Sequence, residues 1–197
     1  MLASYSVEEV TRRLAACASA ADSDEPGLRA AVAAILRRGA TGDAEILLIR
    51  RAERASDPWS GHMALPGGRR DPRDATLEAT AIRETFEEVG VDLARDGELL
   101  LRLADHPAII RTKRVGLVIA PFVFAVRGDP EVRIKDDEIA EALWTPLGAL
   151  ARGEGAGTFL YTHEEATLDL PFLDVGGRRV WGLTYQMLQK LFQALHA

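Results

Sequence analysis

The sequence predicts an α/β fold, an α/β/α sandwich in which helices cover a mixed central sheet. Two observations lead to this prediction. Apolar runs with the length of β-strands occur on both sides of a central helix, and several of them pair locally instead of alternating strictly with helices. The chain has 197 residues, of which 47% are apolar, and this is enough material for one sizeable core.

The N-terminal segment is predicted to be a helix followed by a linker. Ser6 to Ala20 opens with a Ser-x-x-Glu capping box formed by Ser6 and Glu9, and apolar residues recur in it at helical spacing. Ala21 to Gly27 is polar and rich in turn residues, which favours a linker. We therefore expect an N-terminal helix and linker over residues 1–27 and a main domain over residues 28–197.

Two apolar runs open the main domain. Residues 28–39 and 44–51 are separated by Ala-Thr-Gly-Asp, and this spacing predicts a β-hairpin. Residues 53–62 are polar and are interpreted as a loop. Residues 63–68 are interpreted as a short strand that ends at a Gly-Gly turn.

A central helix is predicted from Thr76 to Val89. This stretch contains neither Pro nor Gly, its inward positions share one stripe, and Gly90 supplies a C-terminal cap. The later elements are predicted from apolar runs and their periods. They are strands at residues 98–106 and 115–126, a short strand at 141–147, a helical turn at 147–153, a hairpin at 159–173 and an amphipathic helix at 180–195.

Charge and cysteine content restrict the partners and the compartment. The net charge of -6 disfavours nucleic acid, whose binding needs a basic surface, and no stretch approaches the roughly 18 apolar residues of a membrane span. Cys17 is the only cysteine, so no intramolecular disulfide can form and a cytoplasmic location is expected. Residues 14–17 match a short lipoprotein cleavage pattern, but the apolar run of a secretory signal is missing before them.

Three carboxylates share one face of the predicted central helix. Glu84 precedes Glu87 and Glu88 by three and four positions, spacings at which Cβ atoms stand about 5–6 Å apart. Their repulsion is relieved either by water and nearby arginines or by a hard divalent cation, which prefers oxygen ligands. The neighbouring residues favour the cation, because the Gly67-Gly68 turn can direct a carbonyl oxygen to the same ion and Arg83 can fix a carboxylate by a two-pronged hydrogen bond.

The stretch from Gly68 to Val91 resembles the Nudix box, whose usual form is G-x5-E-x7-R-E-U-x-E-E-x-G-U, with U apolar. The run Arg-Glu-Thr-Phe-Glu-Glu-Val-Gly-Val that starts at Arg83 carries most of the likeness. Three departures occur. Asp74 stands where the first Glu is usual, one extra residue separates it from Arg83, and Thr85 occupies an apolar position.

The likeness extends to the coenzyme A diphosphatase branch of the Nudix hydrolases. Asp74 and the insertion look like the variant box of that branch. Residues 46–74 are similar to its upstream signature, LL..R followed by a G...FPGG turn, and residues 180–185, Val-Trp-Gly-Leu-Thr-Tyr, also agree with it. Leu65 stands where Phe is usual, and Arg51-Ala52 where the pattern has Arg-Ser.

The resemblance implies a fold and an activity. The fold is the Nudix-type α/β/α sandwich with a mixed central sheet. The activity is hydrolysis of a nucleoside diphosphate linked to another moiety, by attack of water on one phosphorus with the help of Mg2+ or Mn2+. The metal ligands that it implies are Gly68, through its carbonyl oxygen, Glu84, Glu87 and Glu88, with Arg83 orienting the carboxylates.

The base that deprotonates the water is left open between a box glutamate and a carboxylate from outside the box. Glu138 and Glu141 flank a predicted strand at which Nudix enzymes often place a late acidic residue. Three residues apart on a strand, the two side chains face opposite sides, so the spacing leaves open which one points inward. A solvated charged loop is the alternative for both.

Substrate contacts are expected near the glycine turn and in the loop before it. Arg69, Arg70 and Arg73 follow the turn and are candidates for phosphate binding, as is the basic run at residues 111–114, with a solvated loop as the alternative for each. Trp59 lies in a polar loop and is the expected platform for an adenine ring.

Two further tryptophans, Trp144 and Trp181, are expected in the core. His62 is interpreted either as a phosphate or water contact or as a structural hydrogen-bond donor. His106 and His163 have no partner at metal-ligand spacing and receive no role.

Several functions remain open at this stage. Coenzyme A or a derivative is the leading substrate, and ADP-ribose, NADH or a nucleoside triphosphate are alternatives, because the box sets the chemistry and the rest of the cleft sets the substrate. A Nudix-fold nucleotide sensor without turnover would be favoured by loss of a box glutamate, and none is lost. A helical di-metal carboxylate protein needs Glu-x-x-His pairs, which the sequence lacks. A homodimer also stays open, with Ser6 to Ala20 as the segment that would pack on a second copy.

Overall fold

The computed structural model describes residues 4–21, 28–55, 57, 59–110, 113–135, 137–163 and 166–197, with the side chains of residues 109, 110, 113–115, 163 and 166 not described. Most of the predicted linker, from residue 22 to residue 27, lies outside the described residues, and so does the start of the basic run at 111–114.

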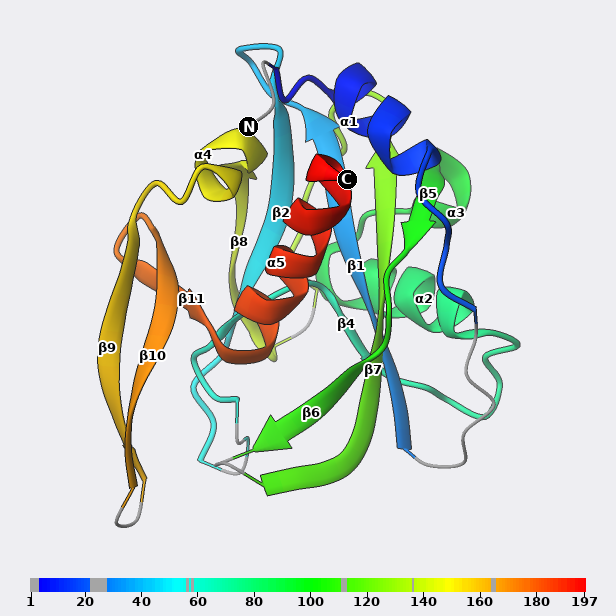
Figure 1. Cartoon of the computed structure of the whole chain (residues 1–197). Helices are drawn as coiled ribbons and strands as arrows, with labels where there is room; N and C mark the ends of the chain where they lie inside the picture. The colour runs from blue at the N-terminus through cyan, green and yellow to red at the C-terminus, as the bar shows by residue number, and fades with distance from the viewer. Residues whose placement is uncertain are drawn as a thin grey trace.

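A mixed sheet of eight strands forms the centre of the molecule (Figure 1). Its strands are β1 Leu28–Arg38, β2 Ala44–Arg51, β3 Met63–Ala64, β4 Gly67–Arg69, β5 Gly97–Arg102, β6 His106–Ile110, β7 Lys113–Val126 and β8 Ile139–Pro146. β1 and β7 are parallel, whereas β1 pairs antiparallel with β4 near its start and with β2 at its end. The β1–β2 pair is the predicted hairpin.

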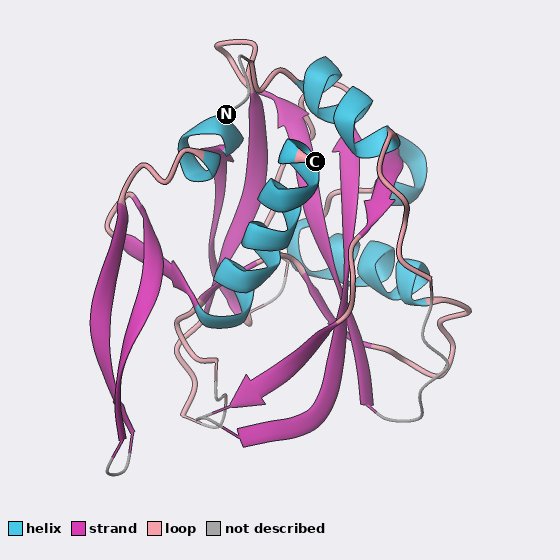
Figure 2. Cartoon of the chain, in the orientation of Figure 1, coloured by secondary structure: helices cyan, strands magenta, loops and turns pink. Residues whose placement is uncertain are grey.

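Helices cover both faces of this sheet, as Figure 2 shows. They are α1 Val7–Ala15, α2 Leu77–Val89, α3 Leu93–Asp96, α4 Leu147–Ala151 and α5 Gly182–His196. Alternate residues of β1 join two different cores: Leu36 packs in the cluster that contains residues of α1 and α5, and Ile35 packs in the cluster that contains residues of α2. The predicted α/β/α arrangement with a mixed sheet is therefore confirmed.

A smaller sheet of three strands stands beside the main one (Figure 1). Its strands are β9 Ala156–His163, β10 Ala166–Val175 and β11 Arg178–Trp181. The β9–β10 pair is the hairpin expected at residues 159–173. β11 was not expected, because the final helix was predicted to start at Val180, and it starts instead at Gly182, whose φ is +61°.

The α1 helix ends at Ala15 and not at Ala20, and only half of its predicted capping box forms. The Ser6 hydroxyl accepts a hydrogen bond from Glu9 N–H at 3.3 Å, but the Ser6 N–H donates to the Ser4 hydroxyl at 3.1 Å. The inward side chains Val10 and Leu14 are fully buried in the chain's own core. These two side chains of the segment Ser6 to Ala20, the candidate for packing on a second copy, are thus covered within one chain.

The α2 helix matches its predicted bounds. The Thr76 hydroxyl accepts from Ala79 N–H at 3.0 Å, and Gly90 ends the helix with a φ of 74°, in the left-handed region that glycine adopts without strain. Its buried positions include the whole predicted stripe: Leu77, Thr80, Ala81, Thr85 and Val89.

The strand expected at residues 98–106 ends at Arg102 as β5, and a further strand that was not expected, β6, starts at His106 after a break. At the break Asp105 accepts hydrogen bonds from Arg29 and Arg102, each at 2.6 Å. Asp105 thus lies between the two strands, beside two largely buried guanidinium groups, and the apolar pattern alone did not predict this interruption.

None of the helices in the described part of the chain is long and apolar enough to cross a bilayer.

Candidate active site

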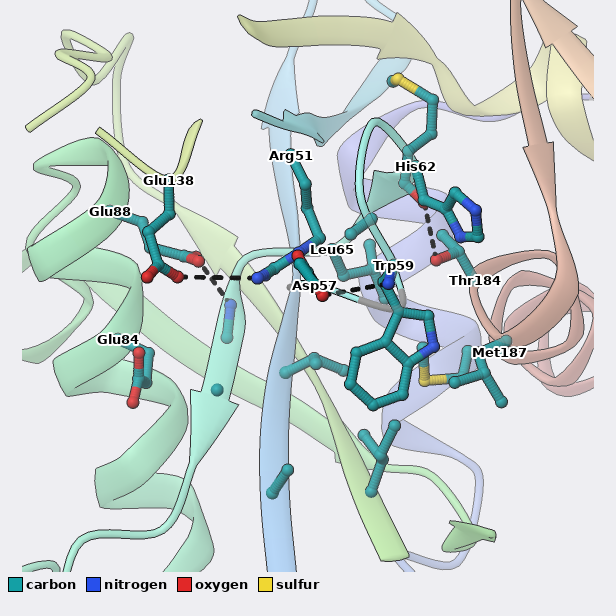
Figure 3. A pocket seen from close by; sticks show the side chains of 18 of the residues that line it. Arg51, Asp57, Trp59, His62, Leu65, Glu84, Glu88, Glu138, Thr184 and Met187 are labelled. Carbon is teal, nitrogen blue, oxygen red and sulfur yellow. Dashed lines mark hydrogen bonds and ion pairs between the residues drawn. The ribbon is translucent and has the colours of Figure 1, made fainter. Parts of the chain in front are cut away.

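A cavity of about 620 Å³ lies where the start of β1, the short strands β3 and β4, the middle of α2 and the first turns of α5 meet (Figure 3). One end is acidic and carries Glu84 and Glu88 of α2. The opposite end is apolar and aromatic, with Trp59, Trp181 and Met187 among its lining residues. The cavity therefore offers a charged compartment and an apolar one within a single opening.

The glycine pair forms the wall of the acidic end. It belongs to the strand β4, paired with β1, and not to the expected turn. Gly67 has a φ of +147°, and a Cβ there would lie 2.2 Å from the Ala31 carbonyl oxygen, so only glycine allows this approach to β1. Its N–H donates to Glu88 Oε2 at 2.9 Å, which fixes a carboxylate that is only 5% exposed.

Gly68 serves a different purpose. A Cβ on this residue would lie 2.6 Å from the carboxyl carbon of Glu84. The absent side chain thus leaves room for the Glu84 carboxylate against the β4 backbone. Burial raises the pKa of Glu84, although the neighbouring Arg83 opposes that rise.

Arg83 connects the carboxylates of the predicted site. Its Nη1 lies 2.9 Å from Glu84 Oε1 and donates to Glu87 Oε2 at 2.8 Å. Its Nε and Nη2 donate to the two oxygens of Asp74 at 3.0 Å and 2.9 Å, a bidentate contact. The hydrogen bonds with Asp74 are the main reason that the pKa of Arg83 is raised. Arg83 thus contacts three carboxylates at once, and its expected orienting role stays a prediction.

Asp74 is itself held in place. Its Oδ2 accepts from the Thr80 hydroxyl and from Asp71 N–H, both at 2.9 Å. The bond from Arg83 is the largest influence on its pKa, and it and these donors hold that pKa well below its usual range, against the effect of burial. A shorter side chain with one extra residue before Arg83 therefore still delivers a charged carboxylate to the guanidinium.

The box glutamates do not all face one point. Glu84 and Glu88 line the cavity, whereas the side chain of Glu87 is 53% exposed and turned to Arg83. Within the described residues, no three His, Cys, Asp or Glu side chains are gathered closely enough to hold a metal ion. The two carboxylates and the glycine backbone that line this end of the cavity offer oxygen atoms, the type of ligand that Mg2+ prefers.

The late acidic residue that faces the cavity is Glu138. It lines the cavity, and its carboxylate accepts from Arg54 Nη1 at 2.9 Å. Glu141 instead accepts from Arg50 Nε at 2.8 Å and from Arg178 Nε at 2.6 Å and is not a lining residue. The structure thus resolves the alternative that spacing alone left open.

Arg51, at the end of β2, also faces Glu138. Its Nη2 lies 3.6 Å from Glu138 Oε2, and its Nε donates to Asp57 Oδ2 at 2.7 Å. Asp57 Oδ1 accepts from Trp59 N–H at 3.0 Å. Burial acts to raise the pKa of Asp57, but these two donors outweigh it and lower the pKa, so this carboxylate stays charged.

The three arginines after the glycine pair differ in their contacts. Arg69 lines the cavity with an exposed side chain, and its carbonyl accepts from Arg83 Nη2 at 3.1 Å. Arg70 does not line the cavity, because its guanidinium donates to the carbonyls of Asp74 and Ala75, each at 3.1 Å. Arg73 is 87% exposed and pairs with Asp71. Arg70 thus braces the loop after the glycine pair, and the expected phosphate contact at Arg70 stays a prediction.

The apolar end holds two tryptophans instead of one. Trp59 is half-buried there and packs against the core, and its expected role as an adenine platform stays a prediction. Trp181 was expected in the core but also lines the cavity, with the His62 ring 4.6 Å from its own. Burial is the main cause that lowers the pKa of His62. Trp144 does not line the cavity and packs under the guanidinium of Arg37 at 4.3 Å.

A comparison with known families decides the identity of the fold. The model of the NUDIX domain matches residues 27–161. The chain belongs to the Nudix family. The resemblance found in the box is thereby confirmed, and Gly68, Glu84, Glu87 and Glu88 occupy its signature positions.

Relatives of this Nudix chain include two named coenzyme A diphosphatases. It is 30% identical over 156 residues to the human "Mitochondrial coenzyme A diphosphatase NUDT8", covering 76% of this chain and 62% of that protein. It is 32% identical to the "Peroxisomal coenzyme A diphosphatase ndx-8" of Caenorhabditis elegans, covering 58% and 47%. The chain thus spans about half to three fifths of the length of these relatives.

The fold of the Nudix chain is also found among solved structures. The crystal structure of a MutT/nudix family protein from Enterococcus faecalis superposes with a TM-score of 0.59 at 19% identity, covering 97% of this chain and 74% of that one. This likeness concerns the fold.

Sequence reasoning missed three charged residues of the Nudix cavity, Arg51, Arg54 and Asp57. Arg54 and its partner Glu138 are 84 positions apart in the chain, so no local spacing announces their contact. The available signal was the density of charged residues around the end of β2, where Arg51, Glu53, Arg54 and Asp57 precede Trp59.

Proposed function

We propose that this Nudix domain hydrolyses the diphosphate of a nucleoside diphosphate linked to another moiety, and that the substrate is coenzyme A or a derivative. The observation that carries the proposal is the two-ended cavity. Glu84, Glu88 and Gly68 lie at the acidic end, where a diphosphate and its metal would sit, and Trp59 and Trp181 lie at the end suited to a base or another apolar group.

The proposed metal ligands are those that the family box implies: the Gly68 carbonyl, Glu84, Glu87 and Glu88. When bound, Mg2+ or Mn2+ stabilises charge on the phosphoryl oxygens and lowers the pKa of the attacking water. Glu88 is already fixed by the Gly67 N–H, and Glu87 lies at the surface beside Arg83.

The other box and cavity residues have supporting roles in this proposal. Arg83, anchored by Asp74, holds Glu84 and Glu87 in place. A box glutamate or Glu138 accepts the proton of the water that attacks phosphorus, while the bond to the bridging oxygen breaks and the leaving phosphate departs with the electron pair.

The substrate choice is supported by the relatives. The printed names of the human and nematode proteins describe coenzyme A diphosphatases, and this chain aligns with more than half of its length to each. Those names also place the relatives in mitochondria and peroxisomes, so the cytoplasmic location of this chain stays a prediction.

A substrate panel tests the proposal. The protein is incubated with Mg2+ or Mn2+ and, separately, coenzyme A, ADP-ribose, NADH and the deoxynucleoside triphosphates, and the products are identified by mass. The expected products from coenzyme A are 4'-phosphopantetheine and adenosine 3',5'-bisphosphate, and EDTA should abolish them. Cleavage of another compound but not of coenzyme A would overturn the substrate, and no cleavage in the panel would overturn the hydrolase.

A further inference from the structure

Two arginines that line the cavity are engaged with one carboxylate. Arg54 Nη1 donates to Glu138 Oε1 at 2.9 Å, and Arg51 Nη2 lies 3.6 Å from Glu138 Oε2. The Ala52 N–H donates to the Glu138 carbonyl at 2.6 Å, so backbone and side chains join the loop after β2 to the turn before β8. Figure 3 shows Arg51 and Glu138 on the side of the cavity next to Glu88.

The Arg51 guanidinium is held from two directions with unequal strength. Its Nε makes a 2.7 Å hydrogen bond to Asp57, whereas the 3.6 Å separation from Glu138 is longer than a hydrogen bond. The Arg51 side chain is 21% exposed, so water screens its charge only in part. One edge of the guanidinium is fixed, and the other points into the cavity with a weak contact.

Arg54 is more strongly paired but also more accessible. Its side chain is 35% exposed, and its partners Glu138 and Asp137 are 46% and 92% exposed. Exposed ion pairs contribute little to stability, about 0–1 kcal/mol. An anion with higher charge can therefore displace these carboxylates without unfolding the loop.

We infer that Arg51 and Arg54 bind phosphate groups of the substrate, and that Glu138 is the internal competitor that they leave when the substrate enters. The inference rests on the proposed function, because it assumes that the cavity takes a diphosphate. A planar guanidinium matches two phosphate oxygens as well as two carboxylate oxygens, and a diphosphate carries more negative charge than one carboxylate.

Glu138 could either position the two arginines or compete with phosphate for them. If Glu138 only positions the arginines, neutralising it loosens them and weakens phosphate binding. If Glu138 competes with phosphate, neutralising it releases the arginines and strengthens phosphate binding. The two roles thus predict opposite signs for the same substitution.

Binding of ADP measured by titration calorimetry in EDTA separates these roles. No metal is present and no turnover is needed, so a negative substrate panel and a negative binding result remain distinguishable. We expect Glu138→Gln to lower the Kd of ADP at least threefold, and Arg54→Gln to raise it about tenfold, which corresponds to 1.4 kcal/mol. In the double variant the gain from Glu138→Gln should shrink, because one of the released arginines is missing.

Glu141→Gln is the matched control. Glu141 is a carboxylate held by two arginines, like Glu138, but it does not line the cavity, so the Kd should stay within twofold of the wild type. Thermal melting checks that each variant folds. If Glu138→Gln does not fold, Arg54→Gln still tests the inference. An unchanged or raised Kd in Glu138→Gln, or a wild-type Kd in Arg54→Gln, overturns the inference.

Discussion

Arg83 is the residue through which the acidic end of the cavity is organised. Its guanidinium reaches Asp74, Glu84 and Glu87 at distances between 2.8 and 3.0 Å. Asp74 is 9% exposed and has further donors of its own, so this end of the contact is rigid. The Arg83 guanidinium, which is held by Asp74, therefore contacts both glutamates. The departures from the usual box at Asp74 leave this arrangement intact.

The Glu87 carboxylate should matter for catalysis and not for folding. Its side chain is 53% exposed and its ion pair with Arg83 is a surface pair, so Glu87→Gln should leave the melting temperature nearly unchanged. If Glu87 is a metal ligand, loss of its charge removes stabilisation of the transition state, and kcat should fall by about two orders of magnitude or more. The measurement is turnover at saturating Mg2+ together with a melting curve.

Glu78→Gln is the control for the loss of one negative charge on the same helix. Glu78 lies in the first turn of α2, away from the lining residues of the cavity, and its replacement should leave kcat unchanged. Wild-type turnover in Glu87→Gln would remove Glu87 from the proposed ligand set.

The strand β4 pairs with β1 and packs against α2, and each of its two glycines leaves room for a different neighbour. In Gly68→Ala the new Cβ meets the Glu84 carboxylate, the far end of a movable side chain, so the fold should survive while Glu84 is pushed aside. In Gly67→Ala the Cβ meets the backbone of Ala31 and Val32 at 2.2 and 2.5 Å, and φ is +147°, so the strand pairing itself should fail.

Both alanine variants can be compared by soluble yield, melting temperature and Mn2+ binding. Gly68→Ala should melt close to the wild type but bind Mn2+ at least tenfold more weakly, and Gly67→Ala should be poorly folded. Equal Mn2+ affinity in Gly68→Ala would show that Glu84 does not need its place against β4.

Elements defined by local pattern could be predicted from the sequence, and elements defined by distant partners could not. α2 and the β1–β2 hairpin follow from periodicity, a capping residue and turn residues. β4 was interpreted as a turn because two glycines in sequence resemble one, although the position of Glu84 and the backbone of β1 are what require them. The break before β6 contains Asp105, whose two arginine partners come from β1 and β5.

The same distinction applies to the candidate site. The box residues stand close together in the sequence, so their spacing predicts one helix face, and Glu84 and Glu88 do line one cavity. Glu138 could be chosen over Glu141 only when the residues that line the cavity were known. A motif predicts the chemistry it contains, whereas the rest of the cavity is assembled by the fold.

For the molecule as a whole, a buried histidine predicts a loss of stability in acid. His106 is 7% exposed, and burial, followed by the charge of Lys190, lowers its pKa although a hydrogen bond with Gln186 opposes this. Histidine in an unfolded chain has a pKa of about 6.5. Below that pH the unfolded state binds a proton that the folded state binds less readily, so the free energy of unfolding should decrease as the pH falls through and below 6.5.

Urea denaturation at pH 7.5 and pH 5.5 measures this effect. The free energy of unfolding of the wild type should decrease between pH 7.5 and pH 5.5, and that of His106→Gln should decrease less. The pKa of His62 is also lowered and acts in the same direction. The double variant His62→Gln/His106→Gln should therefore show the smallest decrease of the three proteins. An equal decrease in the wild type and in both variants would show that these histidines do not couple protonation to folding.

Whether the molecule unfolds as one unit depends on how α1 is attached. Residues 1–27 were predicted as a segment separate from the domain, and that boundary remains a proposal. Leu14 is nevertheless fully buried in a cluster shared with α5 and the main sheet, and Arg13 Nη1 donates to the Leu195 carbonyl at 3.1 Å. These contacts predict that α1 belongs to the same cooperative unit as the sheet.

Leu14→Ala tests this attachment. Removing a fully buried leucine side chain should lower the free energy of unfolding by about 3 kcal/mol and keep a single transition. Leu160→Ala, at a site that is 72% exposed, is the control and should change it by less than about 0.5 kcal/mol. A separate early transition in Leu14→Ala, with the main transition unchanged, would mean that α1 unfolds independently. In that case α1 would not stabilise the cavity. A single transition shifted as a whole would mean that the N-terminal helix stabilises the sheet and α5, on which the apolar end of the cavity is built.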